Sequence, residues 1–221
     1  DDRSVTETLE CLPYVFASYQ AQYPGVPYRI SPAGLGSRLS PFGNEPTPNP
    51  DAIRVTMTRA DPRQRGLLGA AWHLGYAARA AESGVNSLAL GAPTGEFGLL
   101  YSKAAYAQPW FDEAGGIFPA FHVMRALYPA AGAARYSTTS SSPRDMQALS
   151  FETAEGKVLW LANLTGDTLD VDLQGFTPAT AWTLDADTFE QCATSTDGFA
   201  GTETPVTGGL TLNPFEVVKL C

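Results

Sequence analysis

The sequence predicts an α/β segment followed by an all-β module: the last β/α units of a TIM-type (β/α)8 barrel, then an antiparallel β-sandwich. Helical and strand-like patterns alternate up to residue 128, and short alternating apolar runs replace them from residue 134. The balance of charge changes near the same place. We therefore assign residues 1–133 to the carboxyl-terminal segment of a barrel and residues 134–221 to a β-sandwich accessory domain.

The first element is expected to be a helix, because apolar residues recur there at three- and four-residue spacing. Ser4 and Glu7 fit a capping box that would start this helix, and Pro13 is expected to kink or interrupt it. A short strand is expected at residues 26–31. The long connection that follows, residues 32–59, is rich in Gly, Pro, Ser and Asn, and connections of that length are often functional.

A second β/α unit begins at Asp61, which is followed by a proline and fits the N-cap of a helix that closes at Gly84. A strand at residues 85–90, a loop at residues 91–116 and a helix at residues 117–128 come next. Two parallel strands cannot close a barrel or form a covered sheet. Either the chain is a fragment, or it completes a sheet that another chain supplies, and the upstream part of the barrel is the expected partner.

The second domain is predicted from short β-rich runs separated by Gly, Asp, Thr and Ser turns, at intervals of about 8–12 residues. These runs lie at residues 148–151, 158–163, 169–173 and 215–220. The dipeptide Glu155-Gly156 fits a hairpin turn between two of them. Trp160 and Trp182 lie inside strand-like runs, and we expect them in the core rather than on a sugar-binding platform.

Charge and composition exclude several classes of partner. The net charge is −9, and residues 140–221 hold 12 of the 23 acidic residues but only 3 of the 14 basic ones. An acidic β-domain repels phosphate backbones, so no nucleic-acid partner is expected. No stretch approaches the roughly 18 apolar residues of a membrane span. The first residues lack the apolar core of a signal peptide, which says little about location if the chain is part of a longer one. A cytoplasmic location is a separate expectation.

The sequence carries no recognisable cofactor or metal motif. It has no Gly-rich phosphate loop, no His–Glu metal pattern and no G-x-S-x-G elbow. The three cysteines are too few and too scattered for a disulfide framework or a zinc site. A bridge between Cys192 and Cys221 stays open for an oxidising compartment. His73 and His122 lie within predicted helices and are expected to have structural roles.

Candidate site residues lie in the two long loops, because the active site of a TIM-type barrel lies at the carboxyl ends of its strands. In the first loop Arg38, Asn44 and Asn49 are suited to a carboxylate or to sugar hydroxyls. A solvated loop with turn-forming residues is the alternative. Asp61 is expected to cap its helix and also lies near enough to this loop to reach a ligand.

In the second loop, Glu96 follows a strand end, where a carboxylate can act as general acid or base. The alternative is that this side chain caps the loop or faces water. Four arginines lie near the predicted start of the second helix, where they neutralise an anion, brace Asp61 or simply lie at the surface. They are Arg54, Arg59, Arg63 and Arg65.

Three stretches of the sequence resemble the D-apionate lactonase family, and the resemblance extends over about residues 4–128. They are the strand Pro-Tyr-Arg-Ile-Ser-Pro at residues 27–32, the loop Gly-Ser-Arg-x-x-Pro-Phe-Gly at residues 36–43, and the run Asp-Pro-Arg-Gln-Arg-Gly-Leu-Leu-Gly-Ala-Ala-Trp at residues 61–72. The resemblance implies a barrel related to retaining glycoside hydrolases, with these units as its seventh and eighth. In those relatives a glutamate nucleophile ends the seventh strand, where this sequence has Ser-Pro-Ala-Gly at residues 31–34.

Three functions remain open at this level. The leading hypothesis is a carbohydrate-active hydrolase that opens a sugar lactone, such as D-apionolactone, to the aldonic acid by general-base activation of water, with Arg38 gripping the lactone. The second is a retaining glycoside hydrolase that uses Glu96 or Glu45. The third is a non-catalytic carbohydrate-binding fragment.

Overall fold

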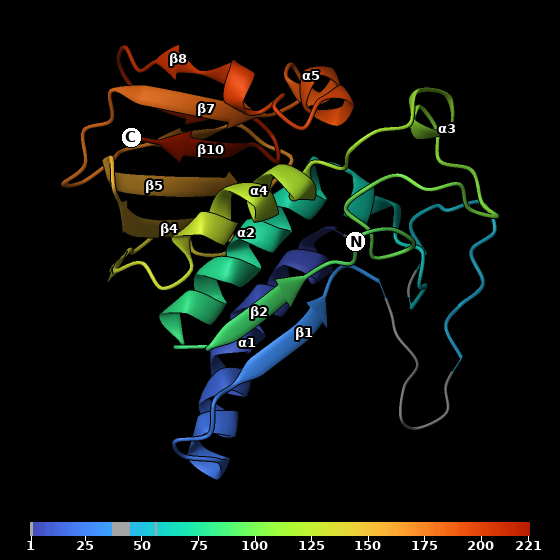
Figure 1. Ribbon diagram of the computed structural model, residues 1–221, viewed down its shortest axis with the longest axis horizontal. Helices are drawn as coiled ribbons and strands as arrows, with labels where there is room; N and C mark the ends of the chain where they lie inside the picture. The colour runs from blue at the N-terminus through green and yellow to red at the C-terminus, as the bar shows by residue number, and fades with distance from the viewer. Residues whose placement is uncertain (1, 37–44, 56) are drawn as a thin grey trace.

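The computed structural model describes residues 2–36, 45–55 and 57–221 of the chain. Figure 1 shows a helical part, which carries two parallel strands, packed against a larger β-sheet. The predicted fold class is confirmed: a partial TIM-type barrel precedes an antiparallel β-sandwich. None of the helices in the described segments is long and apolar enough to cross a membrane.

The barrel segment contains two parallel strands and the helices around them. β1 and β2 pair in parallel, with Arg29 opposite Ser87 and Ile30 opposite Leu88, and the register shifts before Ala33. The pairing expected between the two predicted strands is therefore confirmed. The elements are α1 (Asp2–Gln22), β1 (Arg29–Ala33), η1 (Pro62–Arg65), α2 (Leu67–Glu82), β2 (Ser87–Leu90), α3 (Phe111–Ala114), α4 (Ala120–Leu127) and η2 (Tyr128–Ala130).

Several predicted boundaries differ from the structure. α1 begins at Asp2, so Ser4 lies inside the helix rather than at its cap, and Pro13 also lies within a continuous helix. The helix predicted from Asp61 is divided, because Gly66 has extended backbone angles (φ −107°, ψ −177°) that separate the 3-10 turn η1 from α2. Asp61 does cap η1: its carboxylate accepts the backbone N–H of Arg63 at 2.9 Å.

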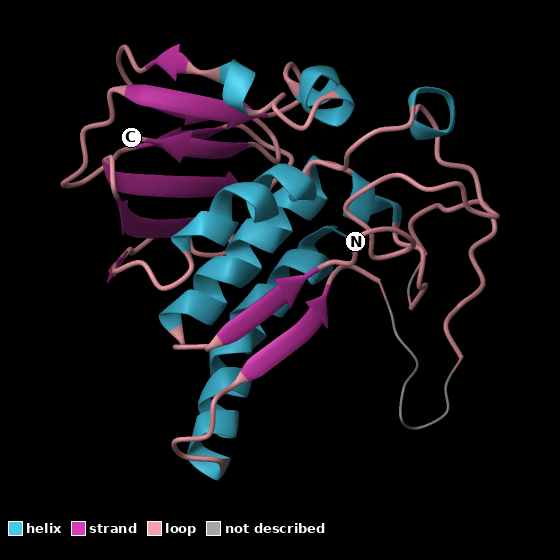
Figure 2. Ribbon diagram, in the orientation of Figure 1, coloured by secondary structure: helices cyan, strands magenta, loops and turns pink. Residues whose placement is uncertain are grey.

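The β-domain consists of a six-stranded antiparallel sheet and a two-stranded one. Strands of the large sheet lie at the upper left of Figure 2. The large sheet has the order β3-β4-β5-β10-β7-β8, and the small sheet pairs β6 with β9. The elements are β3 (Arg135–Tyr136), β4 (Met146–Thr153), β5 (Gly156–Asn163), β6 (Leu169–Val171), β7 (Thr180–Leu184), α5 (Phe189–Thr194), η3 (Ala200–Thr202), β8 (Thr204–Pro205), β9 (Leu210–Leu212) and β10 (Val217–Leu220).

The centre of the large sheet is buried on both faces, as the alternation along β5 shows. Trp160 and Ala162 belong to the core cluster shared with α2, whereas Leu159 and Leu161 belong to a second cluster on the other face, with Leu212 of β9. Trp160 is 1% exposed, which confirms its predicted place in the core. The predicted hairpin turn is also present, since β4 and β5 pair antiparallel up to the turn that joins them.

The two domains share one hydrophobic core rather than touching at their surfaces. Residues of α2 such as Leu74 cluster with Leu149 of β4. Gly75 lets both α1 and β4 lie close to α2. A Cβ at this position would lie 2.6 Å from the Leu9 side chain of α1 and 3.1 Å from the Gln147 side chain of β4. The β-domain therefore packs directly on α2 through strands β4 and β5.

Polar contacts add to this interface. His122 of α4 forms a hydrogen bond of 2.7 Å from Nε2 to the carbonyl of Cys192 in α5, and Arg144 pairs with Glu10 of α1 at 2.7 Å. Both contacts join the helical segment to the β-domain. All three cysteines are free thiols, so the Cys192–Cys221 bridge is not formed.

Candidate active site at the strand ends

The two long connections leave the same edge of the parallel strand pair, on the side to which the arrowheads of β1 and β2 point (Figure 1). We call this edge the strand-end rim.

Gln64 of η1 lies between the two connections and joins them. It is fully buried. Its Oε1 accepts the Leu35 N–H at 3.0 Å, and its Nε2 donates to the Gly98 carbonyl at 3.3 Å. Gly36, with φ +114°, allows close approach, since a Cβ there would lie 2.3 Å from the Arg59 carbonyl oxygen.

Glu96 lies at the rim and is paired with a residue of the other connection. Its Oε2 is 3.2 Å from Nε of Arg59, and the two side chains are 36% and 50% exposed. A half-exposed ion pair contributes little to stability. The position of Glu96 matters more than the energy of the ion pair, because the carboxylate lies at the rim within reach of solvent.

Tyr106 and Arg65 form a second pair beside Glu96. The guanidinium carbon of Arg65 lies 5.7 Å from the centre of the Tyr106 ring. Burial raises the pKa of Tyr106, the charge of Arg65 opposes this rise, and the charge of Glu96 adds to it. The phenol therefore stays protonated at neutral pH and remains an O–H donor.

Arg65 carries an unused donor. Its Nη1 atom is buried and has no hydrogen-bond partner among the described residues. Burial lowers the pKa of Arg65, against the charges of Tyr106, Asp112 and Asp61, but a guanidinium in a protein keeps its proton. An unpaired N–H of this kind is suited to a ligand oxygen.

The other predicted residues are engaged differently. Asp61 is 8% exposed, and Arg63 holds its carboxylate through Nε at 3.0 Å and Nη2 at 2.7 Å, so the expected bracing by an arginine is confirmed. Asn49 donates to the carbonyls of Ile53 and Ala60 at 2.7 and 3.0 Å and accepts the Ile53 N–H, which uses its amide within its own connection.

Arg38 and Asn44 lie outside the described residues. Of the predicted site residues that the structure describes, Glu96 lies at the rim in an ion pair whose two side chains are both partly exposed. Sequence reasoning missed Tyr106, because a single tyrosine in a long aperiodic loop has no pattern that distinguishes it. No group of three or more His, Cys, Asp or Glu side chains that could hold a metal is found in the described part of the chain.

Chemically, this arrangement can take a proton from water and stabilise a negative oxygen. A half-exposed carboxylate can act as general base, while a phenol O–H and a guanidinium N–H are suited to an oxyanion. The end of β1 offers no such group, since its last residues are Ser31, Pro32 and Ala33.

Comparison with known protein families assigns both parts of the chain. The family profile described as "D-apionate lactonase, TIM barrel domain" matches residues 1–132. The profile "D-apionate lactonase, C-terminal immunoglobulin-like domain" matches residues 143–220. A D-apionate lactonase of Brucella anthropi is 35% identical over 180 residues, which cover 81% of this chain and 28% of the relative. The chain thus spans less than a third of that protein.

Solved structures show the same fold at low sequence identity. A conserved exported protein from Bacteroides fragilis is similar with a TM-score of 0.56 at 12% identity, over 98% of this chain and 43% of that one. An arabinofuranosidase gives 0.55 at 11% identity, over 100% and 50%. A GH30 endoxylanase from Clostridium papyrosolvens gives 0.51 at 12% identity, over 91% and 43%. On the strength of the two family matches and the Brucella relative, this chain belongs to the D-apionate lactonase family.

Proposed function

We propose that the complete protein hydrolyses a sugar lactone of the D-apionolactone type to its aldonic acid. The proposal is supported by family membership and by the relative named D-apionate lactonase. This chain would contribute the seventh and eighth β/α units and the β-domain. β1 has exposed residues at Arg29, Ser31 and Pro32, and the upstream barrel units would cover them and complete the pocket.

One observation carries the choice of reaction. The rim holds a half-exposed carboxylate, Glu96, beside the donors of Tyr106 and Arg65, whereas β1 ends without an ionisable side chain. A retaining glycosidase needs two carboxyl groups about 5–5.5 Å apart. Lactone opening needs only one base and one oxyanion site, and we assign these roles to Glu96 and to the donors of Tyr106 and Arg65.

In the proposed mechanism Glu96 accepts a proton from a water molecule, and the water oxygen attacks the lactone carbonyl carbon. The Arg65 and Tyr106 donors stabilise the oxygen that becomes negative. The bond between the carbonyl carbon and the ring oxygen then breaks, the ring oxygen receives the proton from Glu96, and the product is a hydroxy acid. Arg38, Asn44 and Asp61 remain proposed substrate-binding residues on sequence grounds.

The direct test replaces Glu96 by Gln in the complete protein and follows acid release from D-apionolactone and other aldonolactones in a pH-stat. We expect kcat to fall by about 10²- to 10⁴-fold, the usual contribution of a general base. Glu113→Gln is the matched control, because Glu113 is an exposed carboxylate of the same connection. Unchanged lactone hydrolysis in the Glu96 variant would show that the base lies elsewhere.

The same protein should be assayed with nitrophenyl glycosides, including an arabinofuranoside. Release of nitrophenol without lactone opening would replace the proposal by the glycosidase alternative, and the Glu96→Gln and Glu45→Gln variants would then identify its carboxylate. The non-catalytic alternative has little support from the two tryptophans of the β-domain. Trp160 is buried, and Lys219 covers Trp182 with its Nζ atom 3.9 Å from the ring centre.

A further inference from the structure

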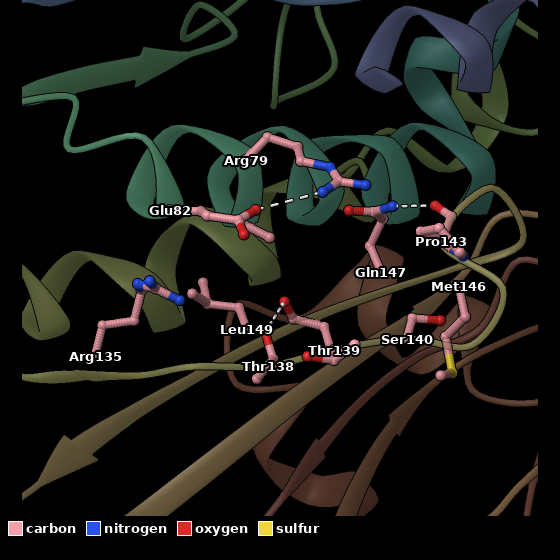
Figure 3. Close-up of a pocket in the computed structure, with 12 residues that line it drawn as sticks. Arg79, Glu82, Arg135, Thr138, Thr139, Ser140, Pro143, Met146, Gln147 and Leu149 are labelled. Atoms are coloured by element: carbon pink, nitrogen blue, oxygen red, sulfur yellow. Dashed lines mark hydrogen bonds and ion pairs between the residues drawn. The ribbon is translucent and has the colours of Figure 1, made fainter. Parts of the chain in front are cut away.

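A cavity of about 240 Å³ lies between the last turns of α2 and strand β4 (Figure 3). We call it the α2–β4 cavity. Helix α2 begins at the strand-end rim and has 16 residues, a length of roughly 24 Å at 1.5 Å per residue. The cavity therefore lies at the opposite end of the helix from the candidate active site. Its walls come from both domains: Ala78, Arg79, Glu82, Arg135, Thr138, Thr139, Ser140, Pro143, Met146, Gln147, Ala148 and Leu149.

The charge of the lining is positive, although the chain as a whole carries −9. The lining residues include two basic ones, Arg79 and Arg135, and one acidic one, Glu82. Glu82 pairs with Arg79 through Nη1 at 3.3 Å and is itself 52% exposed. A pocket with two guanidinium groups and one largely solvated carboxylate favours an anion.

Arg79 is the residue best placed to hold that anion. Its side chain is 20% exposed, and its Nε atom is buried without a hydrogen-bond partner among the described residues. Figure 3 shows its guanidinium and the Gln147 amide extending toward one another from opposite walls. Leaving a buried guanidinium N–H unpaired costs free energy, and a carboxylate, which accepts two parallel N–H bonds from arginine, would satisfy it.

Hydroxyl groups complete the lining on the β-domain side. Thr138, Thr139 and Ser140 follow one another along the wall of the cavity. The Thr138 hydroxyl donates to the Ala148 carbonyl at 3.2 Å and can still accept, while the Ser140 oxygen accepts the Ser142 N–H at 3.1 Å and can still donate. Such groups suit the hydroxyls of a sugar-derived chain.

We propose that the α2–β4 cavity binds a small hydroxylated carboxylate, that is, a sugar acid, at a site separate from the strand-end rim. The carboxylate would lie on Arg79, and the ligand hydroxyls would face Thr138, Thr139 and Ser140. The volume is below the roughly 300–1,000 Å³ of sites for drug-sized ligands, which fits a molecule of a few carbons. The aldonic acid of the proposed reaction belongs to this class, but binding here does not depend on that reaction.

Isothermal titration calorimetry of the complete protein with D-gluconate tests the proposal. We expect saturable binding that weakens at least tenfold in Arg79→Gln. In Glu82→Gln it should become severalfold tighter, because the carboxylate that competes for Arg79 is gone. Arg3→Gln is the charge-matched control: Arg3 lies on α1, pairs with Glu7, does not line the cavity and should leave the affinity unchanged.

Two further anions identify the ligand chemistry. Acetate lacks the hydroxyls and inorganic phosphate lacks the carbon chain, so both should bind at least tenfold more weakly than gluconate. Equal affinity for phosphate and gluconate would overturn the sugar-acid assignment. Gluconate binding that is the same in wild type, Arg79→Gln and Glu82→Gln would place the ligand elsewhere, and no saturable binding would also overturn the proposal. If Arg79→Gln does not fold, Thr139→Val replaces it, with an expected loss of threefold or more.

Discussion

Gln64 accepts a hydrogen bond of 3.0 Å from the backbone N–H of Leu35, 29 positions earlier in the chain. The same side chain donates to the carbonyl of Gly98 at 3.3 Å, 34 positions later. One fully buried amide thus joins the connection after β1 to the connection after β2. The relative position of the two loops of the candidate site depends on this side chain.

Replacing Gln64 by Leu should lower the free energy of unfolding by about 1–3 kcal/mol, because it leaves the buried Leu35 N–H and the Gly98 carbonyl unpaired. Urea denaturation followed by circular dichroism measures this. Gln174→Leu is the control, since Gln174 is exposed and its side chain donates to nearby Asp172. A loss in Gln64→Leu no greater than in the control would show that the amide bridge does not stabilise the loops.

Tyr106→Phe should reduce kcat for lactone opening by about tenfold or more, since it removes one donor to the negative oxygen of the proposed transition state. KM should change little, because the donor acts mainly as charge develops. Steady-state kinetics on an aldonolactone separate the two constants. Tyr14→Phe is the control, as Tyr14 is 77% exposed on α1; equal rates in both variants would remove Tyr106 from the proposed mechanism.

The stability of the fold should depend on the protonation of His73. This residue is fully buried, and burial lowers its pKa from 6.5 to about 4, against the effect of its hydrogen bond with the Gly69 carbonyl. The folded state thus holds neutral histidine, and the stability this gives is complete above about pH 6.5 and lost as the pH falls toward 4. His73→Leu should remove about 1 kcal/mol of the difference in unfolding free energy between pH 7.5 and pH 5.5.

Urea denaturation at the two pH values measures this difference. An exposed histidine would have no such effect, so an unchanged slope in His73→Leu would indicate that the side chain is solvated. Burial also lowers the pKa of His122, and therefore some acid sensitivity of the same sign should remain in the variant.

Glu216 should produce the opposite pH dependence. It is 4% exposed, and burial raises its pKa from 4.5 to about 7, although the Asn213 N–H bonded to it opposes the rise. The folded state favours the protonated acid, so its contribution to stability is complete below about pH 4.5 and lost as the pH rises to 7. Glu216→Gln should therefore stabilise the protein at pH 8 by about 2 kcal/mol, with a smaller gain at pH 5.5.

Glu203→Gln is the control for this effect, because Glu203 is exposed beside β8. Thermal denaturation at pH 8 and pH 5.5 should show a gain for Glu216→Gln that grows with pH, and little change for Glu203→Gln. A gain that is equal at both pH values would mean that the carboxyl does not titrate in this range.

Much of the fold could be predicted because its signals are local. The apolar spacing of α1 and α2 and the alternation along β5 each record which side of one element is buried. Boundaries were less accurate: Gly66 separates η1 from α2, and the extended backbone at one residue leaves no trace in an apolar pattern. Glu96 could be proposed from its place after a strand end, but its ion pair with Arg59 could not, because the two residues lie 37 positions apart on different connections.

The sequence by itself predicted the main helices and the two strands up to residue 128, an all-β module after them, and the family motifs at residues 27–43 and 61–72. Only the tertiary structure shows which polar side chains already have partners within the protein and which face a cavity or the rim. Asn49 closes its own loop, Tyr106 reaches Arg65, and Arg79 faces a cavity built from two domains. The physical reason is that secondary structure follows from burial along one element, whereas a site depends on the packing of several elements that are distant in the chain.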